Sequence, residues 1–165
     1  RYVRAFIVYA KNKDLQQTRA LLIEEYKKDS SRFDILQDIG KVSYYMRDFP
    51  AAYQYYQTFL NVRKARQLDV YRHENLIIGY TLAKVGHRQQ AEELIADYKK
   101  YIDADQSIYR DLGHAMYYSY QGNQAKALEH MERFAQQENI QYWVILFLEA
   151  DPLIDNIKTN REFQR

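Results

Sequence analysis

The chain repeats one pattern, in which two amphipathic segments are joined by a short polar turn. Three copies align, starting at Ile39, Ile78 and His114: IGKVSYYMRDFPAAYQYYQTFL, IGYTLAKVGHRQQAEELIADYK and HAMYYSYQGNQAKALEHMERFA. A fainter copy precedes them, YVRAFIVYAKNKDLQQTRALLIEEYKK. In each copy the apolar residues recur at helical spacing on both sides of the turn. The pattern therefore predicts four helix–turn–helix units.

Markers within the units recur at a nearly constant interval. The turns fall at 12–14, 47–48, 86–87 and 122–123, and each is polar or contains glycine. A small residue follows every turn, with intervals of 34, 39 and 36 residues: Thr18, Ala52, Ala91 and Ala127. An interval of about 34 residues is typical of helical repeats. With only 5 glycines and 2 prolines the chain also lacks the turns of a β-rich fold, so we predict an all-α protein.

The aligned segments resemble tetratricopeptide repeats over roughly residues 2–140. That family has a small residue in the first helix of each repeat, where the second helix crosses closely. The residues at that place here are Gly40, Gly79 and Ala115. The chain departs from the family pattern late in each second helix, where large residues replace a small one: Phe59, Tyr98 and Phe134. The resemblance implies one domain, 1–165, forming a right-handed superhelix of about four repeats (approximately 1–31, 32–66, 70–105 and 107–139) with a C-terminal cap at 140–165.

Helices are expected near 2–11, 14–28, 32–47, 49–65, 69–85, 88–102, 106–121, 124–137 and 140–149, with short helical turns after 152. Side chains that cap helix starts support several of these boundaries. Asp14, Asp48 and Asn123 each stand just before a predicted helix. Asp151 precedes Pro152, which repeats the combination of a cap and an early proline.

The C-terminal segment FLEADPLIDNIKTNREFQR has a resemblance of its own. It is similar to the segment that closes many bacterial tetratricopeptide arrays at the C-terminal end of cyclases, kinases and transcription regulators. We expect the apolar stretch from Tyr142 to Leu148 to form a capping helix over the last helix pair. Because the chain begins at Arg1 and is already helical in pattern at Tyr2, we also expect it to be part of a longer protein with an upstream signalling or DNA-binding domain.

Composition narrows the classes of function. The absence of cysteine excludes a disulfide framework and thiol catalysis. The net charge of +2 comes from interspersed charges, which gives little support to nucleic-acid binding despite the basic stretch NVRKARQ at 61–67. No apolar run approaches the eighteen or so residues of a membrane span. We expect a cytoplasmic protein without membrane contact.

Motifs for catalysis and for cofactor binding are missing. The four histidines show no metal-ligand spacing, since RHENL lacks a second histidine one turn after the first. The sequence has no phosphate-binding glycine loop and no Gly-x-Ser-x-Gly elbow. We therefore expect no enzymatic activity, no cofactor, no metal and no small-molecule substrate.

The stretch YYMRDFPAAYQYYQTFL places five tyrosines within seventeen residues. Tyr56 lies in the register of the interface between paired helices, and Tyr53 lies on a neighbouring face, so both are expected to pack. Tyr55 is expected to be partly exposed. Tyr44 and Tyr45 end a first helix, where the resemblance implies that side chains face the concave groove.

By the same register, we predict that an aromatic groove containing lysines binds a protein or peptide segment. Its predicted residues are Lys41, Tyr44, Tyr45, His73, Tyr80, Lys84, Tyr109, Met116 and Tyr120, with Arg4, Lys11 and Gln37 beside them. A partner with acidic and apolar side chains fits this chemistry. Alternatively, the tyrosines pack on one another or on a further domain of the same chain. The chain could also be a spacer or a homodimerisation module.

Overall fold

The structure is a computed structural model that describes residues 2–158, with side chains from Val3 onward. Its regular elements over this range are all helical, as predicted. In chain order they are α1 (Tyr2–Asn12), α2 (Leu15–Lys28), α3 (Phe33–Tyr45), α4 (Phe49–Ala65), η1 (Arg72–Glu74), α5 (Asn75–Lys84), α6 (Arg88–Ala104), α7 (Arg110–Tyr120), α8 (Gln124–Ala135), α9 (Tyr142–Ile145), η2 (Leu148–Ala150) and α10 (Pro152–Lys158).

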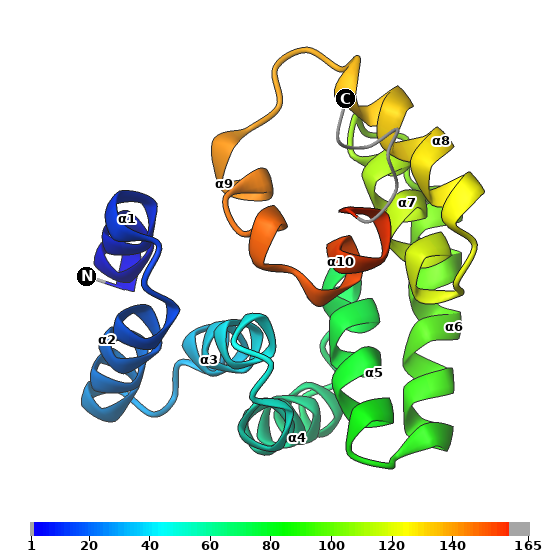
Figure 1. Cartoon of the computed structure of the whole chain (residues 1–165). Helices are drawn as coiled ribbons and strands as arrows, with labels where there is room; N and C mark the ends of the chain where they lie inside the picture. The colour runs from blue at the N-terminus through cyan, green and yellow to red at the C-terminus, as the bar shows by residue number, and fades with distance from the viewer. Residues whose placement is uncertain (1, 159–165) are drawn as a thin grey trace.

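Consecutive helices pack as pairs. The most extensive helix contacts join α1 to α2, α3 to α4, α5 to α6 and α7 to α8, and successive pairs touch through α2–α3, α4–α5 and α6–α7. Figure 1 shows the pairs arranged along a curve that runs from α1 to α8. This pairing agrees with the four predicted helix–turn–helix units.

The turn inside each pair has the same backbone conformation. One residue per turn has a positive φ angle: Lys13 (58°), Arg47 (58°), Gly86 (95°) and Gly122 (76°). The residue after it is the N-cap of the second helix, and the side chains of three of these N-caps, Asp14, Asp48 and Asn123, accept hydrogen bonds from backbone N–H groups three residues on. These bonds satisfy donors that the helix itself leaves unpaired. The predicted helix caps are confirmed at all three positions.

Two glycines permit the close crossing of paired helices. A Cβ atom added at Gly40 would lie 2.8 Å from the ring of Tyr56, and one at Gly79 would lie 2.7 Å from Ile95 Cγ1. Both distances are shorter than a normal carbon–carbon contact. Tyr56 is fully buried and Ile95 nearly so, which confirms that Tyr56 is a packing residue.

Two predicted helices begin or end elsewhere. The helix expected at 69–85 begins only at Asn75, after a 3-10 turn, because Tyr71 has a left-handed φ of 58°. The helix expected at 140–149 is broken into α9 and η2, and no residue of α9 is buried. The expectation that Tyr142 to Leu148 forms one capping helix is therefore wrong.

The C-terminal segment covers more than the last helix pair. Its helix α10 packs on α7 and α8, as a cap would. The residues before it, however, cross to α1 and α3 on the inside of the curve, where Figure 1 shows α9 and α10 between the two arms of the array. We call residues 141–158 the tail. The last residues of the predicted closing segment, 159–165, lie outside the described residues.

Candidate binding site on the inner face

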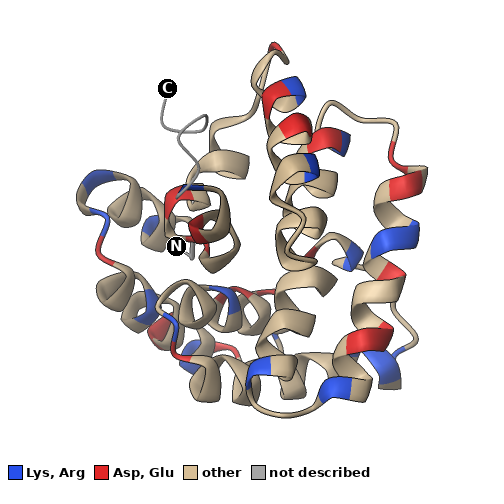
Figure 2. Cartoon of the chain, turned by 45° about the vertical axis from the view of Figure 1, so that its right-hand side comes forward, with Lys and Arg blue, Asp and Glu red and all other residues tan. Residues whose placement is uncertain are grey.

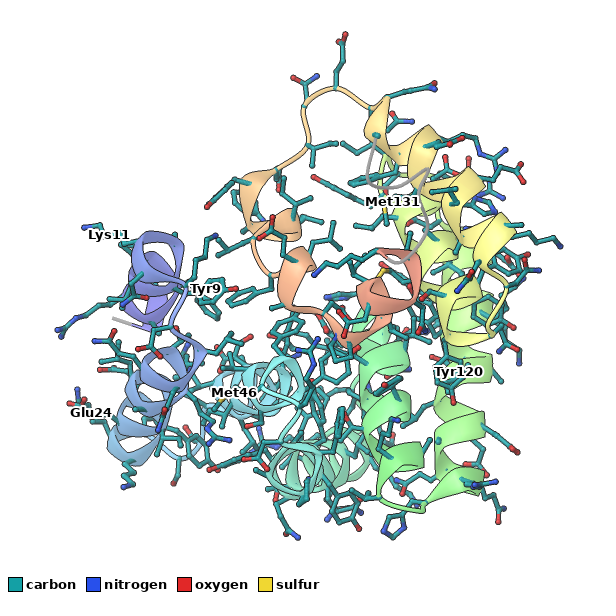
Figure 3. All side chains as sticks on the ribbon, in the orientation of Figure 1. Tyr9, Lys11, Glu24, Met46, Tyr120 and Met131 are labelled. Carbon is teal, nitrogen blue, oxygen red and sulfur yellow. The ribbon has the colours of Figure 1, made fainter. Side chains whose placement is uncertain are left out.

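Phe147 of the tail lies between two tyrosine rings from different helix pairs. Its ring stacks on Tyr9 of α1 with centroids 4.2 Å apart, and on Tyr45 of α3 with centroids 5.0 Å apart. The edge of Phe6 completes the enclosure at 5.7 Å. Figure 3 shows Tyr9 pointing from α1 toward the tail. Such aromatic contacts stabilise beyond the burial of apolar area alone, so Phe147 holds the tail to the first two pairs.

Asp151 anchors the centre of the tail to Tyr44. The Tyr44 hydroxyl donates a hydrogen bond of 2.6 Å to Asp151 Oδ1, and the Leu153 backbone N–H donates one of 2.9 Å to the same oxygen. Burial raises the pKa of Asp151 to about 6, although the bond from Tyr44 lowers it in part. Burial and the Asp151 carboxylate together raise the pKa of Tyr44 well above its usual value, so its hydroxyl remains a donor.

Arg47, the left-handed residue of the second turn, binds the tail from its edge. Its guanidinium donates to the carbonyl of Ala150 at 3.0 Å and to Asp155 Oδ2 at 2.6 Å. Both side chains of this ion pair are about half exposed, so the pair adds little stability. Its effect is to fix the register of the tail against the turn.

The end of the tail is held by aliphatic burial. Leu153, Ile154 and Ile157 of α10 are at most 1% exposed. The Ser119 hydroxyl of α7 donates to the carbonyl of Leu153, and the Asn156 side chain donates to the carbonyl of Ser119 at 3.3 Å. The tail therefore contacts both ends of the array through side chains and backbone.

A cavity of about 390 Å³ remains beneath the tail. It lies among α3, η1, α5, α6, α7 and the tail. Five residues of the predicted groove line it: Lys41, Tyr45, His73, Tyr109 and Met116. The structure thus brings five of the nine predicted groove residues to one partly open space.

The remaining predicted residues lie elsewhere on the inner face. Tyr80, Lys84 and Tyr120 line a second depression, in which the Lys84 ammonium sits 5.3 Å from the Tyr80 ring centroid. Tyr44 lines neither space and is fully buried. Tyr44 and Tyr45 thus face inward as expected, but the tail covers them.

Several acidic residues of this region were not anticipated from the sequence. Lys41 pairs with the buried Glu74 at 2.8 Å. Burial raises the pKa of Glu74, but Lys41 and His73 outweigh burial and lower that pKa to about 2. Asp38, one helical turn before Lys41, has a pKa raised to about 7 by burial. Glu74 directly precedes the apolar residues of α5. This position is the sequence feature from which the burial of Glu74 could have been predicted.

Charged and polar groups outside this region show structural roles. Arg63, in the basic stretch at 61–67, donates to the carbonyl of Val70 at 3.2 Å. Figure 2 shows charges of both signs interspersed along the helices. His114 stacks on His130 at 5.0 Å, and His114 contacts Asp103 at 3.0 Å. No group of three or more metal-binding side chains occurs within the described part of the chain.

The chain is all-helical and consists of consecutive helix pairs. Its own tail occupies the inner face of these pairs. Searches of protein-family models, curated protein sequences and solved structures found no significant match to this chain. Among the described helices, none combines the length and apolar character that crossing a membrane requires.

Proposed function

We propose that the chain is a non-catalytic interaction module whose inner face binds a peptide or protein segment. In this proposal the helix pairs are tetratricopeptide-like repeats in a right-handed superhelix, attached to an upstream signalling or DNA-binding domain in a bacterial cytoplasm. Stacked helix pairs create extended concave surfaces suited to such ligands.

The observation that supports this proposal is the docking of the tail on the inner face. Its contacts define a recognition pattern: an aromatic residue (Phe147), an aspartate four positions later, and aliphatic residues at positions 153, 154 and 157. This is a segment with acidic and apolar side chains, the chemistry expected of a partner. The tail would then be the internal competitor of an external segment of similar pattern.

A spacer or dimerisation module is the second candidate. Val3 and Ile7 of α1 are about half exposed, at 54% and 51%, at the end of the array. Exposed aliphatic residues one turn apart suit contact with a further repeat or with a second copy. A molecular mass in solution equal to twice that of the chain would favour this alternative.

A nicked chain tests the peptide-binding proposal without removing any residue. A protease site placed between the exposed residues Gln137 and Glu138 allows the α8–α9 connection to be cut after folding. A fluorescent peptide of residues 141–165 is then added in excess, and its anisotropy is followed. We expect saturable binding as the peptide replaces the cut tail.

Two altered peptides make the test specific. Replacing Phe147→Ala in the peptide removes the ring between the two tyrosines and should weaken binding by at least about tenfold, since truncation of a buried aromatic anchor costs on the order of 2 kcal/mol or more. Replacing Trp143→Ala should change nothing, because Trp143 is 68% exposed. Equal binding of the two altered peptides, or no saturable binding, would refute the proposed site.

A further inference from the structure

The cavity beneath the tail has the features of a small-molecule site. Its floor comes from the helix pairs, including Leu76, Ile77 and Met116, and its roof from Val144 and Leu148 of the tail. At about 390 Å³ it falls within the range of about 300–1,000 Å³ that is usual for small-molecule sites. Exposed His73 and Ser107 stand at its edge, where a ligand can enter.

The charges around the cavity are unbalanced. Three carboxylates line it, from Glu74, Asp105 and Asp151, together with one ammonium, that of Lys41. Lys41 is already paired with Glu74 at 2.8 Å. Lys41 and His73 both contact Glu74, whereas no described cation pairs with Asp105 or Asp151, so a further cation in the cavity would be favoured.

Asp151 presents an available acceptor in this cavity. Its side chain is 6% exposed, and both hydrogen bonds it accepts end on Oδ1. No described residue donates to Oδ2, so this oxygen is open to a donor from a ligand in the cavity. A ligand N–H group would supply the missing donor.

Aromatic rings supply the rest of the wall. Tyr45, Tyr98, Tyr101 and Tyr109 all line the cavity. The hydroxyl of Tyr98 is bound to the carbonyl of Gly113 at 3.0 Å, and that of Tyr109 accepts from the backbone N–H of Gln141 at 3.0 Å. Because two of the hydroxyls already have partners, a ligand would contact mainly the surfaces of the tyrosine rings. Aromatic faces attract organic cations and also pack against apolar bodies.

We propose that this cavity binds a small organic amine, with its ammonium group at Asp151 and its apolar body among the tyrosines. Because the tail forms the roof, a bound amine contacts the tail and the helix pairs together. It therefore also slows release of the tail.

Three probes with one body and different end groups test the charge preference. Phenylpropylamine, phenylpropanol and phenylpropionate are titrated into the full chain near pH 7.5 and followed by NMR shifts of residues around the cavity. We expect the amine to bind at least about tenfold more tightly than the alcohol, and the carboxylate to bind least. Equal affinities for the three probes, or no binding of the amine at millimolar concentration, would overturn the proposal.

Variants locate the ammonium group. Asp151→Asn keeps Oδ1 as an acceptor for Tyr44 and Leu153 but places an N–H₂ group where the ligand should donate. We expect it to weaken amine binding by about tenfold, while Asp69→Asn, with a side chain 83% exposed and outside the cavity, leaves affinity unchanged. If Asp151→Asn lowers the thermal midpoint, Asp105→Asn serves as the second variant and should weaken binding several-fold. Unchanged affinity in the folded cavity variants overturns the proposal.

The nicked chain tests the effect on the tail. In the presence of saturating phenylpropylamine, the labelled tail peptide should leave the nicked chain several-fold more slowly. An unchanged release rate would overturn the claim that the ligand bridges the tail and the helix pairs.

Discussion

At the scale of single residues, two glycines determine how closely the paired helices approach. Gly40 faces Tyr56, and Gly79 faces Ile95, with no space for a Cβ atom at either place. Glycine inside a helix costs about 1 kcal/mol relative to alanine, and the close packing of a large residue offsets that cost. Both contacts could be predicted from the sequence, because the glycines and their partners recur at fixed positions within the repeat.

Gly79→Leu should therefore destabilise the protein by about 2–3 kcal/mol, because the added side chain overpacks the crossing of α5 and α6. Urea midpoints of the variant and the wild type measure this change. Ala96→Leu is the matched control, since Ala96 is exposed on α6 and should tolerate leucine with little change. If both variants have the wild-type midpoint, the crossing is not close.

Asp38 should make stability depend on pH in an unusual direction. Burial raises its pKa from 3.8 in the unfolded chain to about 7 in the folded one. The folded state therefore binds more protons between these values, so stability falls as pH rises from about 4 to 7. Asp151, with a pKa near 6, adds to the same trend.

Asp38→Asn should reduce the fall in the free energy of unfolding as pH rises. At pH 8 we expect the variant to be more stable than the wild type by on the order of 2 kcal/mol. Denaturant unfolding at pH 5 and pH 8 measures it. Asp34→Asn on the same helix is the control, because Arg32 lowers the pKa of Asp34 and its titration ends below this range. A pH profile of Asp38→Asn that parallels the wild type would show that Asp38 titrates normally.

At the scale of elements, the conformation of the tail is the part of the fold that the sequence did not predict. Its apolar stretch predicted a regular capping helix, but α9 has no buried residue, and the buried residues Leu146 and Phe147 follow it. The rings that hold Phe147 belong to Tyr9 and Tyr45, each more than a hundred residues away in the chain. Local periodicity cannot identify such distant contacts, and these contacts override local helix preference.

Phe147→Ala should release the first half of the tail while leaving α10 and the helix pairs folded. The loss of a buried phenylalanine costs about 3 kcal/mol or more, which acts here on tail docking. Hydrogen exchange should then become much faster at the backbone amides of Ala150 and Asp151, which donate to the carbonyls of Phe147 and Leu148, and stay nearly unchanged in α3 and α5. Trp143→Ala, which alters an exposed ring, should change neither set. Protected tail amides in Phe147→Ala would mean that the stack does not hold the tail.

At the scale of the whole molecule, the tail links the first helix pair to the last across the inner face. The order of the pairs follows from the repeated sequence, whereas the occupied inner face depends on contacts between its ends. The sequence identified many of the residues that face inward, including Lys41, Tyr45 and Met116. It did not reveal that the tail covers them. The position of a residue in the helical repeat assigns its side chain to a face of the array but does not indicate what packs on that face.

The central claim, that the tail is docked on the inner face, is tested most directly by through-space NMR contacts of the Phe147 ring. The ring centroids of Phe147 and Tyr45 are 5.0 Å apart, and those of Phe147 and Tyr9 are 4.2 Å apart. In the full chain we predict cross-peaks from Phe147 to both tyrosine rings. A Phe147 ring without either contact, together with tail amides that exchange at unfolded rates, would contradict the account.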